Sequence, residues 1–310
     1  MKATYLVRDD DKAAQVEKFV QVLELHQLEV FGDATYQTNM RRQEKLRRPQ
    51  ELPGEEDVEK MKQYTIMRMS NMLADEYLLW DFHSFAELRD LVVSRLTLFN
   101  ARRGGEPVRL TLMQWMDAEN NSWLDKTRTE AFANDLDCDR FQEMKVTFQG
   151  GKGNNHVVPV LFPLDTIQGM RNLVEVRNQV GIPEENCYAF PYTQASLNHV
   201  SGWHSVKRIA TAAEVPYPER LTATKMRHRV STLYAAMNIS EQDRQLFYKH
   251  MGHSSDINQH IYQAPLAEAE IRSVGSRLME LHGAVRPHTS SSAACATAGE
   301  SSHSVPINVA

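Results

Sequence analysis

The sequence contains little cysteine and no long hydrophobic run. Its three cysteines, Cys138, Cys187 and Cys295, are odd in number and widely spaced, which argues against a disulfide framework and a cysteine-based zinc site. No run of about 18 apolar residues is present, and the first ten residues lack the apolar region of a secretory signal. These absences predict a soluble, intracellular protein with reduced thiols and no membrane segment.

The chain also lacks the surplus of positive charge that is usual in nucleic-acid-binding proteins. Its 35 Lys and Arg residues against 40 Asp and Glu residues give a formal net charge of −5. The charges are segregated, because six basic and two acidic residues lie between 207 and 229. A local DNA-binding surface is therefore compatible with the composition, and we expect its binding to be weak and salt-sensitive.

At 310 residues, of which 42% are hydrophobic, the chain is long enough for one large domain with an extension. Apolar residues at helical spacing predict a short amphipathic helix at 12–30, and a basic linker follows. We expect a short helical N-terminal segment with its linker at 1–47 and the main domain at 48–282. The tail at 283–310, rich in Ser, Ala and His, is predicted to be disordered.

The spacing of apolar residues distinguishes predicted strands from predicted helices in the main domain. Alternating apolar residues around a turn rich in Gly and Asn predict strands near 144–149 and 156–162. Apolar residues spaced three and four positions apart predict helices elsewhere. Acidic residues suited to a first helical turn mark the start of one helix at Glu55. The other predicted helical regions are 78–100, 164–180, 195–213 and, with breaks at Asn238, Gly252 to Ser255 and Pro265, 222–282. The fold class is therefore expected to be mainly α with a small β-sheet or hairpin (α+β).

Three residues suited to phosphate chemistry follow one another near the end of the chain: Arg227, His253 and Tyr262. They lie within Thr-Lys-Met-Arg-His and Met-Gly-His-Ser-Ser, with Tyr262 nine residues beyond His253. A tyrosine is a poor nucleophile at neutral pH because its pKa is about 10. Cations must therefore surround the phosphate that it attacks, and arginine matches phosphate oxygens best.

Two upstream blocks carry further cations. The string Ala-Arg-Arg-Gly-Gly-Glu ends at Glu106 and offers Arg103 as the candidate, with Arg102 as the fallback. The second block, Gly-Gly-Lys-Gly, places Lys152 in the turn between the two predicted strands. A phosphate-binding P-loop is excluded because no Ser or Thr follows Lys152 and no helical pattern begins there. A solvated turn is the alternative for Lys152.

In this order the four blocks resemble the catalytic domain of tyrosine recombinases and phage-type integrases. That family has an arginine in a Gly-x-Arg-x-x-Glu setting, a lysine on a β-hairpin, a second arginine, and a Leu-Gly-His-Ser-like turn nine residues before the nucleophilic tyrosine. The Thr-x-x-Arg form at Thr224, the Arg103 block and the Arg-Arg-Pro-x-x-Leu-Pro string at Arg47 are most similar to Crypton-like recombinase proteins of animal genomes. The resemblance implies the DNA breaking-rejoining catalytic fold for the main domain, preceded by a reduced core-binding region.

The resemblance also implies a mechanism for site-specific recombination or integration. Tyr262 would attack a DNA phosphate and form a 3′-phosphotyrosyl intermediate. Arg103 and Arg227 would hold the nonbridging oxygens, Lys152 would protonate the leaving 5′-oxygen, and His253 would hydrogen-bond the phosphate. No metal or other cofactor is implied. The implied partners are double-stranded DNA and further copies of the chain in a synaptic tetramer, and the implied location is the nucleus.

Five further residues around the second arginine are candidates for DNA binding: Thr224, Lys225, His228, Arg229 and Arg208. Thr224 replaces the histidine that most recombinases carry three residues before this arginine. A threonine hydroxyl can hydrogen-bond a phosphate oxygen but cannot act as a general base near pH 7. We therefore expect slower cleavage at this site.

Two other functions remain open. The chain could be a domesticated DNA-binding protein with weak or no cleavage activity, which Thr224 and the acidic balance favour and the retained Tyr262 opposes. It could also act like a type IB topoisomerase, a class that lacks the same histidine. A metal site at His250, His253 and His260 is disfavoured, because there is no His-Glu-x-x-His pair and no cysteine nearby.

Overall fold

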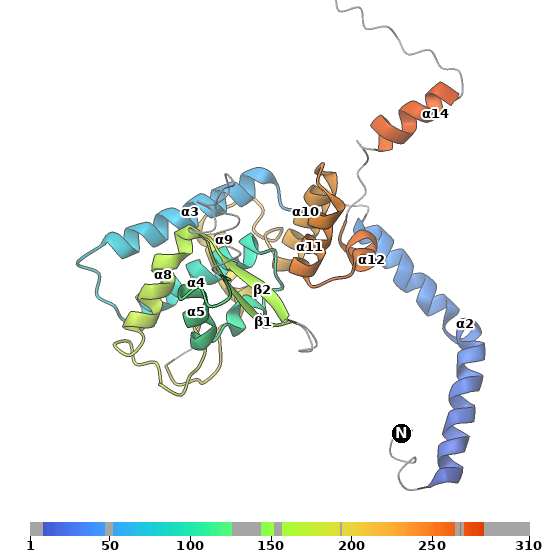
Figure 1. The fold of residues 1–310 in the computed structure, drawn as a ribbon, viewed down its shortest axis with the longest axis horizontal. Helices are drawn as coiled ribbons and strands as arrows, with labels where there is room; N and C mark the ends of the chain where they lie inside the picture. The colour runs from blue at the N-terminus through green and yellow to red at the C-terminus, as the bar shows by residue number, and fades with distance from the viewer. Residues whose placement is uncertain are drawn as a thin grey trace, which may run out of the picture. The chain divides into compact units, whose positions relative to one another are not determined.

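The computed structural model describes residues 9–46, 52–125, 144–151, 157–192, 194–263, 267 and 270–281. Contacts divide the chain into one unit that ends at Pro265 and a second that begins at Leu266. The architecture is mainly helical with one two-stranded antiparallel sheet (Figure 1), which confirms the predicted fold class. No helix within the described ranges is both long and apolar enough to cross a bilayer.

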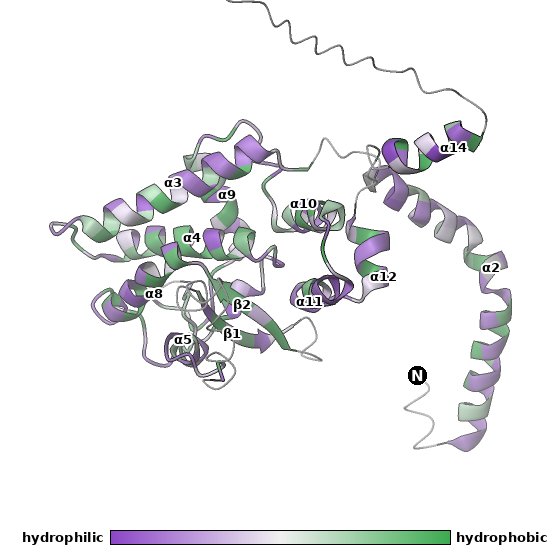
Figure 2. Cartoon of the chain, turned by 45° about the horizontal axis from the view of Figure 1, so that its top comes forward, coloured by the Kyte–Doolittle hydropathy of each residue, from purple (hydrophilic) through white to green (hydrophobic). Residues whose placement is uncertain are grey.

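Helix α2 (Asp10–Leu46) is longer than the predicted segment at 12–30. The apolar pattern ends near residue 30, but the polar residues beyond it are mostly good helix formers, so the helix continues. Polar and apolar residues are mixed along its length (Figure 2), and Phe19, Leu25 and Val30 are exposed. The boundary of apolar periodicity was therefore a poor guide to the end of this helix.

Helix α4 (Phe82–Phe99) lies at the centre of the core. It begins after Asp81, whose carboxylate accepts a hydrogen bond from the backbone N–H of Ser84 at 2.8 Å, so it starts later than the predicted residue 78. Buried residues occur on nearly every side of it. Three helices pack against it, namely α3 (Glu55–Ala74), α8 (Leu164–Val176) and α9 (Gly202–Ala212).

The predicted helix at 195–213 is wrong in its first part, because α9 begins only at Gly202. The preceding residues pair with an earlier segment: Tyr192 donates its N–H to Asn198 O, and Val200 donates to Phe190 O, both at 2.8 Å. Because these backbone N–H and C=O groups hydrogen-bond to each other, they do not require the hydrogen bonds of a helical turn.

Strands β1 (Lys145–Gly150) and β2 (Val157–Phe162) confirm the predicted hairpin, with Thr147 opposite Val160 and Gln149 opposite Val158. Thr147 and Gln149 are the buried residues of β1. Gln149 tolerates burial because its amide donates to the Glu106 carbonyl at 2.7 Å. The turn with Lys152 lies outside the described residues.

From Ala223 to Tyr262 the first unit is helical, with the predicted breaks at Asn238 and at Gly252 to Ser254, whereas Ser255, predicted to lie in the second break, begins the next helix. The break predicted at Pro265 and the disorder predicted for 283–310 lie outside the described residues. The remaining elements of the chain are η2 (Pro107–Arg109), α5 (Leu112–Glu119), α10 (Ala223–Ala236), α11 (Glu241–Met251), α12 (Ser255–Ile257) and η4 (Asn258–Tyr262), and in the second unit η5 (Glu270–Gly275) and α14 (Ser276–Leu281).

Candidate active site

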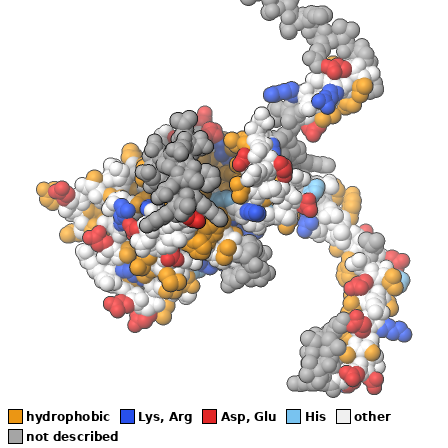
Figure 3. Space-filling view, in the orientation of Figure 1, with side chains coloured by type: hydrophobic (Ala, Val, Ile, Leu, Met, Phe, Trp, Pro, Cys, Tyr) orange, Lys and Arg blue, Asp and Glu red, His pale blue; other side chains and the backbone are white. Residues whose placement is uncertain are grey.

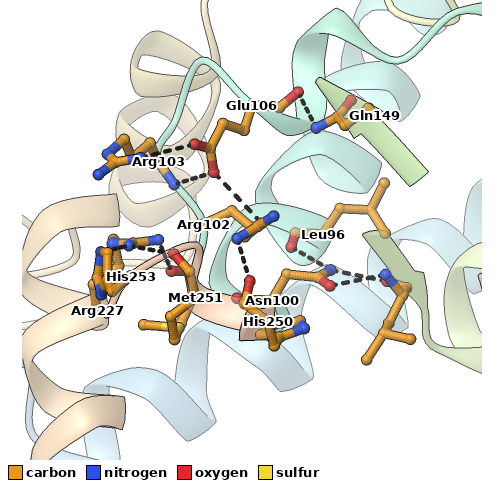
Figure 4. A network of polar contacts seen from close by, with 12 residues as sticks. Leu96, Asn100, Arg102, Arg103, Glu106, Gln149, Arg227, His250, Met251 and His253 are labelled. Carbon is orange, nitrogen blue, oxygen red and sulfur yellow. Dashed lines mark hydrogen bonds and ion pairs between the residues drawn. The ribbon is translucent and has the colours of Figure 1, made fainter. Parts of the chain in front are cut away.

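Helix α10 holds Arg227 inside the protein. Thr222 caps the start of this helix, because its hydroxyl oxygen accepts the backbone N–H of Lys225 at 3.2 Å. Arg227 is only 1% exposed. Its guanidinium donates to Ala101 O at 3.1 Å and to Met251 O at 2.8 Å (Figure 4). It therefore joins the loop after α4 to the end of α11.

The turn after α11 places His253 beside this arginine. Gly252 has φ 65°, in the left-handed region that glycine adopts most easily. The N–H of Gly252 then reaches Lys249 O and the N–H of His253 reaches Tyr248 O, both at 3.0 Å, which closes a Schellman cap. His253 Nε2 accepts a hydrogen bond from Nη2 of Arg227. A neutral imidazole with its proton on Nδ1 fits this contact.

Tyr262 ends the short helical segment that follows. Ser254 caps α12 by accepting the N–H of Ile257 at 3.3 Å, and the chain continues through the wider π-helical turn of η4. The ring of Tyr262 stacks on the ring of His253, with centroids 4.2 Å apart and planes 11° apart. The guanidinium carbon of Arg227 lies 5.1 Å from the Tyr262 centroid.

Arg102 and Arg103 occupy different environments in the loop after α4. Arg103 pairs with the buried carboxylate of Glu106 at 3.1 Å and keeps 36% of its side chain exposed. Arg102 is fully buried, with Nε 3.4 Å from the same carboxylate. Only Arg103 therefore presents a guanidinium to solvent at this site. Glu106 was not among the predicted site residues, although the Arg-x-x-Glu spacing is a signal for it.

The surrounding charges shift the pKa values of the site. Burial first, and then the nearby charges of Arg227, Arg103 and Arg102, lower the pKa of His253 to about 3. The pKa of Arg103 is raised: burial opposes this, but the charge of Glu106 and interactions with Tyr262 prevail. The imidazole is thus held neutral among cations.

Several buried donors at the site have no hydrogen-bond partner among the described residues. They are Nε of Arg227, Nη2 of Arg102 and Nδ1 of His253. An unpaired buried donor costs free energy. Those of Arg227 and His253 belong to the groups that surround the Tyr262 ring, and an anion such as a phosphate would satisfy donors of this kind.

Only some of the predicted DNA-binding residues lie at this site. Nδ1 of His228 lies 3.0 Å from the carbonyl oxygen of Tyr262. Arg208 is half-exposed and donates to Asp90 at 2.7 Å. Arg229 donates to Pro53 O at 3.1 Å and also pairs with Glu55. These contacts engage part of the charge that was predicted to face DNA.

Thr224 is exposed and lines a cavity of about 660 Å³ beside the loop of Arg103, together with Gly104 and Trp203. Lys225 is half-buried. On the face shown in Figure 3, acidic and basic side chains are interspersed, so this face carries mixed charge. Within the described ranges, no group of three His, Cys, Asp or Glu residues is placed to hold a metal ion.

No family model matches the chain, and no curated protein matches its sequence. Two solved structures of the XerH site-specific recombinase bound to DNA are similar to it. The post-cleavage complex with a palindromic difH substrate is 17% identical, with a TM-score of 0.43, and the match covers 75% of this chain and 52% of that one. The pre-cleavage complex with a difH substrate is 15% identical, with a TM-score of 0.42, and covers 71% and 52%. The chain thus spans about half the length of these recombinases.

Proposed function

We propose that this chain breaks and rejoins DNA strands in site-specific recombination or integration, with Tyr262 as the nucleophile. The observation that carries this proposal is the stack of the Tyr262 and His253 rings at 4.2 Å, with the Arg227 guanidinium 5.1 Å from the phenol ring. A phenol, an imidazole and a guanidinium therefore share one site. Attack on a phosphodiester needs this combination, because negative charge builds on the phosphate as the bond forms.

In the proposed reaction, the Tyr262 oxygen forms a bond to phosphorus, and the bond between phosphorus and the 5′-oxygen breaks. The phenol proton passes to solvent, and Lys152 gives a proton to the leaving 5′-oxygen. The products are a 3′-phosphotyrosyl link and a free 5′-hydroxyl. Attack by that hydroxyl restores the original strand, and attack by a hydroxyl of a second strand joins the two strands. The phosphotyrosyl link keeps the energy of the broken bond, so no cofactor has to supply it.

We assign the phosphate contacts to one exposed guanidinium and to two buried donors that lack a partner among the described residues. Arg103 offers its exposed guanidinium, and Arg227 offers the Nε donor that has no partner among the described residues. Nδ1 of His253 supplies a third donor if its imidazole stays neutral, as its lowered pKa favours. Charge-assisted hydrogen bonds to phosphate oxygens are strong in such buried settings.

Duplex DNA is the proposed partner, and further copies of the chain are proposed to assemble on it in the nucleus. The second unit supports self-association, because Ile271, Leu278 and Leu281 are 72%, 49% and 82% exposed. Exposed apolar residues at helical spacing suit contact with another protein surface. Light scattering of DNA complexes, for the original chain and for a Leu278→Lys variant, would measure this assembly.

Covalent trapping tests the proposed nucleophile. A pool of randomised duplexes with a nick near the centre loses its 5′-hydroxyl fragment after cleavage, so the phosphotyrosyl complex accumulates and survives denaturation. We expect trapping by the original chain and none by Tyr262→Phe. Tyr234→Phe is the matched control, because Tyr234 lies on α10 as Arg227 does, but its ring stacks on Phe247 at 3.8 Å. Equal trapping by Tyr262→Phe would refute the assignment.

The same assays separate the rival functions. Duplex binding without trapping by the original chain would indicate a DNA-binding protein that no longer cuts, a candidate that Thr224 at the base position favours. Relaxation of supercoiled plasmid by single copies, without paired sites, would indicate a topoisomerase. Trapping that depends on paired sites supports recombination.

A further inference from the structure

Two arginines donate hydrogen bonds to carbonyl groups at the same helix end. Helix α11 finishes at Met251, and its last carbonyl groups carry the partial negative charge of the helix dipole. Arg102 donates from Nη1 to the carbonyl of His250, and Arg227 donates from Nη2 to the carbonyl of Met251 at 2.8 Å (Figure 4). One arginine comes from the loop after α4 and the other from α10, so three segments are joined at this point.

Arg102 is less accessible to a DNA phosphate than Arg103 is. Its side chain is fully buried, whereas that of Arg103 beside it is 36% exposed. Burial lowers the pKa of Arg102 to about 10, although the charge of Glu106 opposes this shift. A buried cation of this kind costs desolvation free energy. It is therefore expected to serve a neighbouring group.

The neighbouring group is the turn that carries His253. The bond from Arg102 to His250 O has a counterpart, because Nε2 of His250 lies 3.1 Å from Asn100 O. These reciprocal bonds fix the loop after α4 against the last turn of α11. The Schellman cap begins immediately afterwards at Gly252, so any shift of the helix end moves the His253 ring on which Tyr262 stacks.

We infer that Arg102 is a positioning residue, which holds the end of α11 so that His253 and Tyr262 keep their stacked geometry. The inference concerns the geometry of the free protein, and its consequence for cleavage rests on the proposed function. A displacement of about 1 Å at a reacting group is enough to cost about 10²-fold in rate. Arg102 therefore acts through the His253 turn, whereas Arg103 and Arg227 act on phosphate directly.

A matched control separates positioning from ordinary stabilisation. Arg177 is likewise buried, with 5% exposure, and its guanidinium donates to the carbonyls of Asn186 and Tyr188. Neither residue takes part in the proposed chemistry. The variants Arg102→Met and Arg177→Met each remove a buried, carbonyl-binding guanidinium, and Arg102→Lys restores the charge without the fork of donors.

The first experiment uses the free protein. Amide hydrogen exchange at Gly252 and His253, and the NMR signals of the His253 ring, report the turn directly. We expect at least tenfold faster exchange and shifted ring signals in Arg102→Met, and partial recovery in Arg102→Lys. Arg177→Met should lower the melting temperature without either change. Unaltered exchange and ring signals in Arg102→Met would overturn the inference.

The second experiment uses DNA. Trapping by Arg102→Met should fall by about 10²-fold, while duplex affinity changes less than twofold. A fall only in proportion to the unfolded fraction, as expected for Arg177→Met, would also overturn the inference. Absence of trapping by the original chain would count against the proposed function alone, because the exchange and NMR measurements still decide the role of Arg102.

Discussion

The rings of His253 and Tyr262 lie almost parallel, with centroids 4.2 Å apart and an angle of 11° between their planes. The two residues are nine positions apart in the sequence: His253 precedes α12, and Tyr262 is the last residue of η4. Their contact depends on the left-handed Gly252 before the first ring and on the wide turn of η4 before the second. The imidazole therefore supports one face of the proposed nucleophile.

Stability should decrease as pH falls below neutrality. Burial is the main cause that lowers the pKa of His253 from 6.5 to about 3 and that of His250 from 6.5 to about 4. The unfolded chain takes up protons below about pH 6.5, whereas the folded chain does so only near pH 4 and below, so protons favour unfolding in this window. We expect the melting temperature to fall from pH 7 to pH 4, as measured by calorimetry.

The variant His253→Asn tests whether His253 causes this dependence of the melting temperature on pH. Asparagine does not titrate, and its side-chain oxygen can still accept a hydrogen bond from Arg227. We expect a flatter dependence of melting temperature on pH. The control is Thr222→Ala, which removes a helix cap and should lower the melting temperature similarly at each pH. An unchanged slope in His253→Asn would mean that this histidine is not protected from protonation.

The cap of α10 should contribute measurable stability. Thr222→Ala removes the acceptor for the Lys225 N–H and is expected to lower the free energy of unfolding by about 1 kcal/mol. Urea denaturation measures this difference. Thr224→Ala, two residues later on the exposed side of the same turn, should change it by less than about 0.5 kcal/mol. Equal losses in both variants would contradict the cap.

The close approach of two glycines should not tolerate a side chain. A methyl group on Gly202 would overlap the carbonyl oxygen of Gly104, in the loop that carries Arg103, whereas a methyl on Gly105 would meet nothing within 4 Å. We expect Gly202→Ala to lower the free energy of unfolding by about 1–3 kcal/mol. In thermal and urea denaturation, Gly105→Ala should stay close to the original chain. The reverse order would show that this contact is not maintained.

A histidine at position 224 should accelerate cleavage. General bases contribute about 10²- to 10⁴-fold, and Thr224 cannot supply one near pH 7. We expect Thr224→His to raise the single-turnover trapping rate by about 10²-fold, with a pH profile that rises near the pKa of the new imidazole. Thr224→Gln, which is polar but not basic, should show no gain. A gain shared by both variants would indicate improved binding instead.

Lys152 should be needed for departure of the 5′-oxygen. We expect Lys152→Ala to reduce trapping on ordinary DNA by about 10²-fold. A substrate with sulfur in place of the 5′-bridging oxygen has a better leaving group that needs no proton, so it should restore the rate of Lys152→Ala. It should not restore Arg227→Gln, which loses a proposed phosphate contact. Failure to rescue Lys152→Ala would remove the acid role from this lysine.

The sequence by itself determined the main architecture of the chain. Apolar periodicity of two and of three to four residues marked the hairpin and most helices, because these patterns reflect local backbone geometry. The cap at Thr222, the acidic first turn at Glu55 and the break at Gly252 were also local. The residues Arg103, Arg227, His253 and Tyr262 became candidates because the motifs around them, in this order, resemble those of tyrosine recombinases.

The tertiary structure decided the features that local sequence patterns do not encode. The start of α9 at Gly202 depends on pairing between 190–192 and 198–200, and the burial of Gln149 depends on the carbonyl of Glu106. The burial of Arg102, in contrast to the partial exposure of Arg103, depends on α11, which lies about 150 residues further along the chain. Local sequence fixes which groups are available, whereas packing between distant segments fixes which of them are buried, paired or accessible.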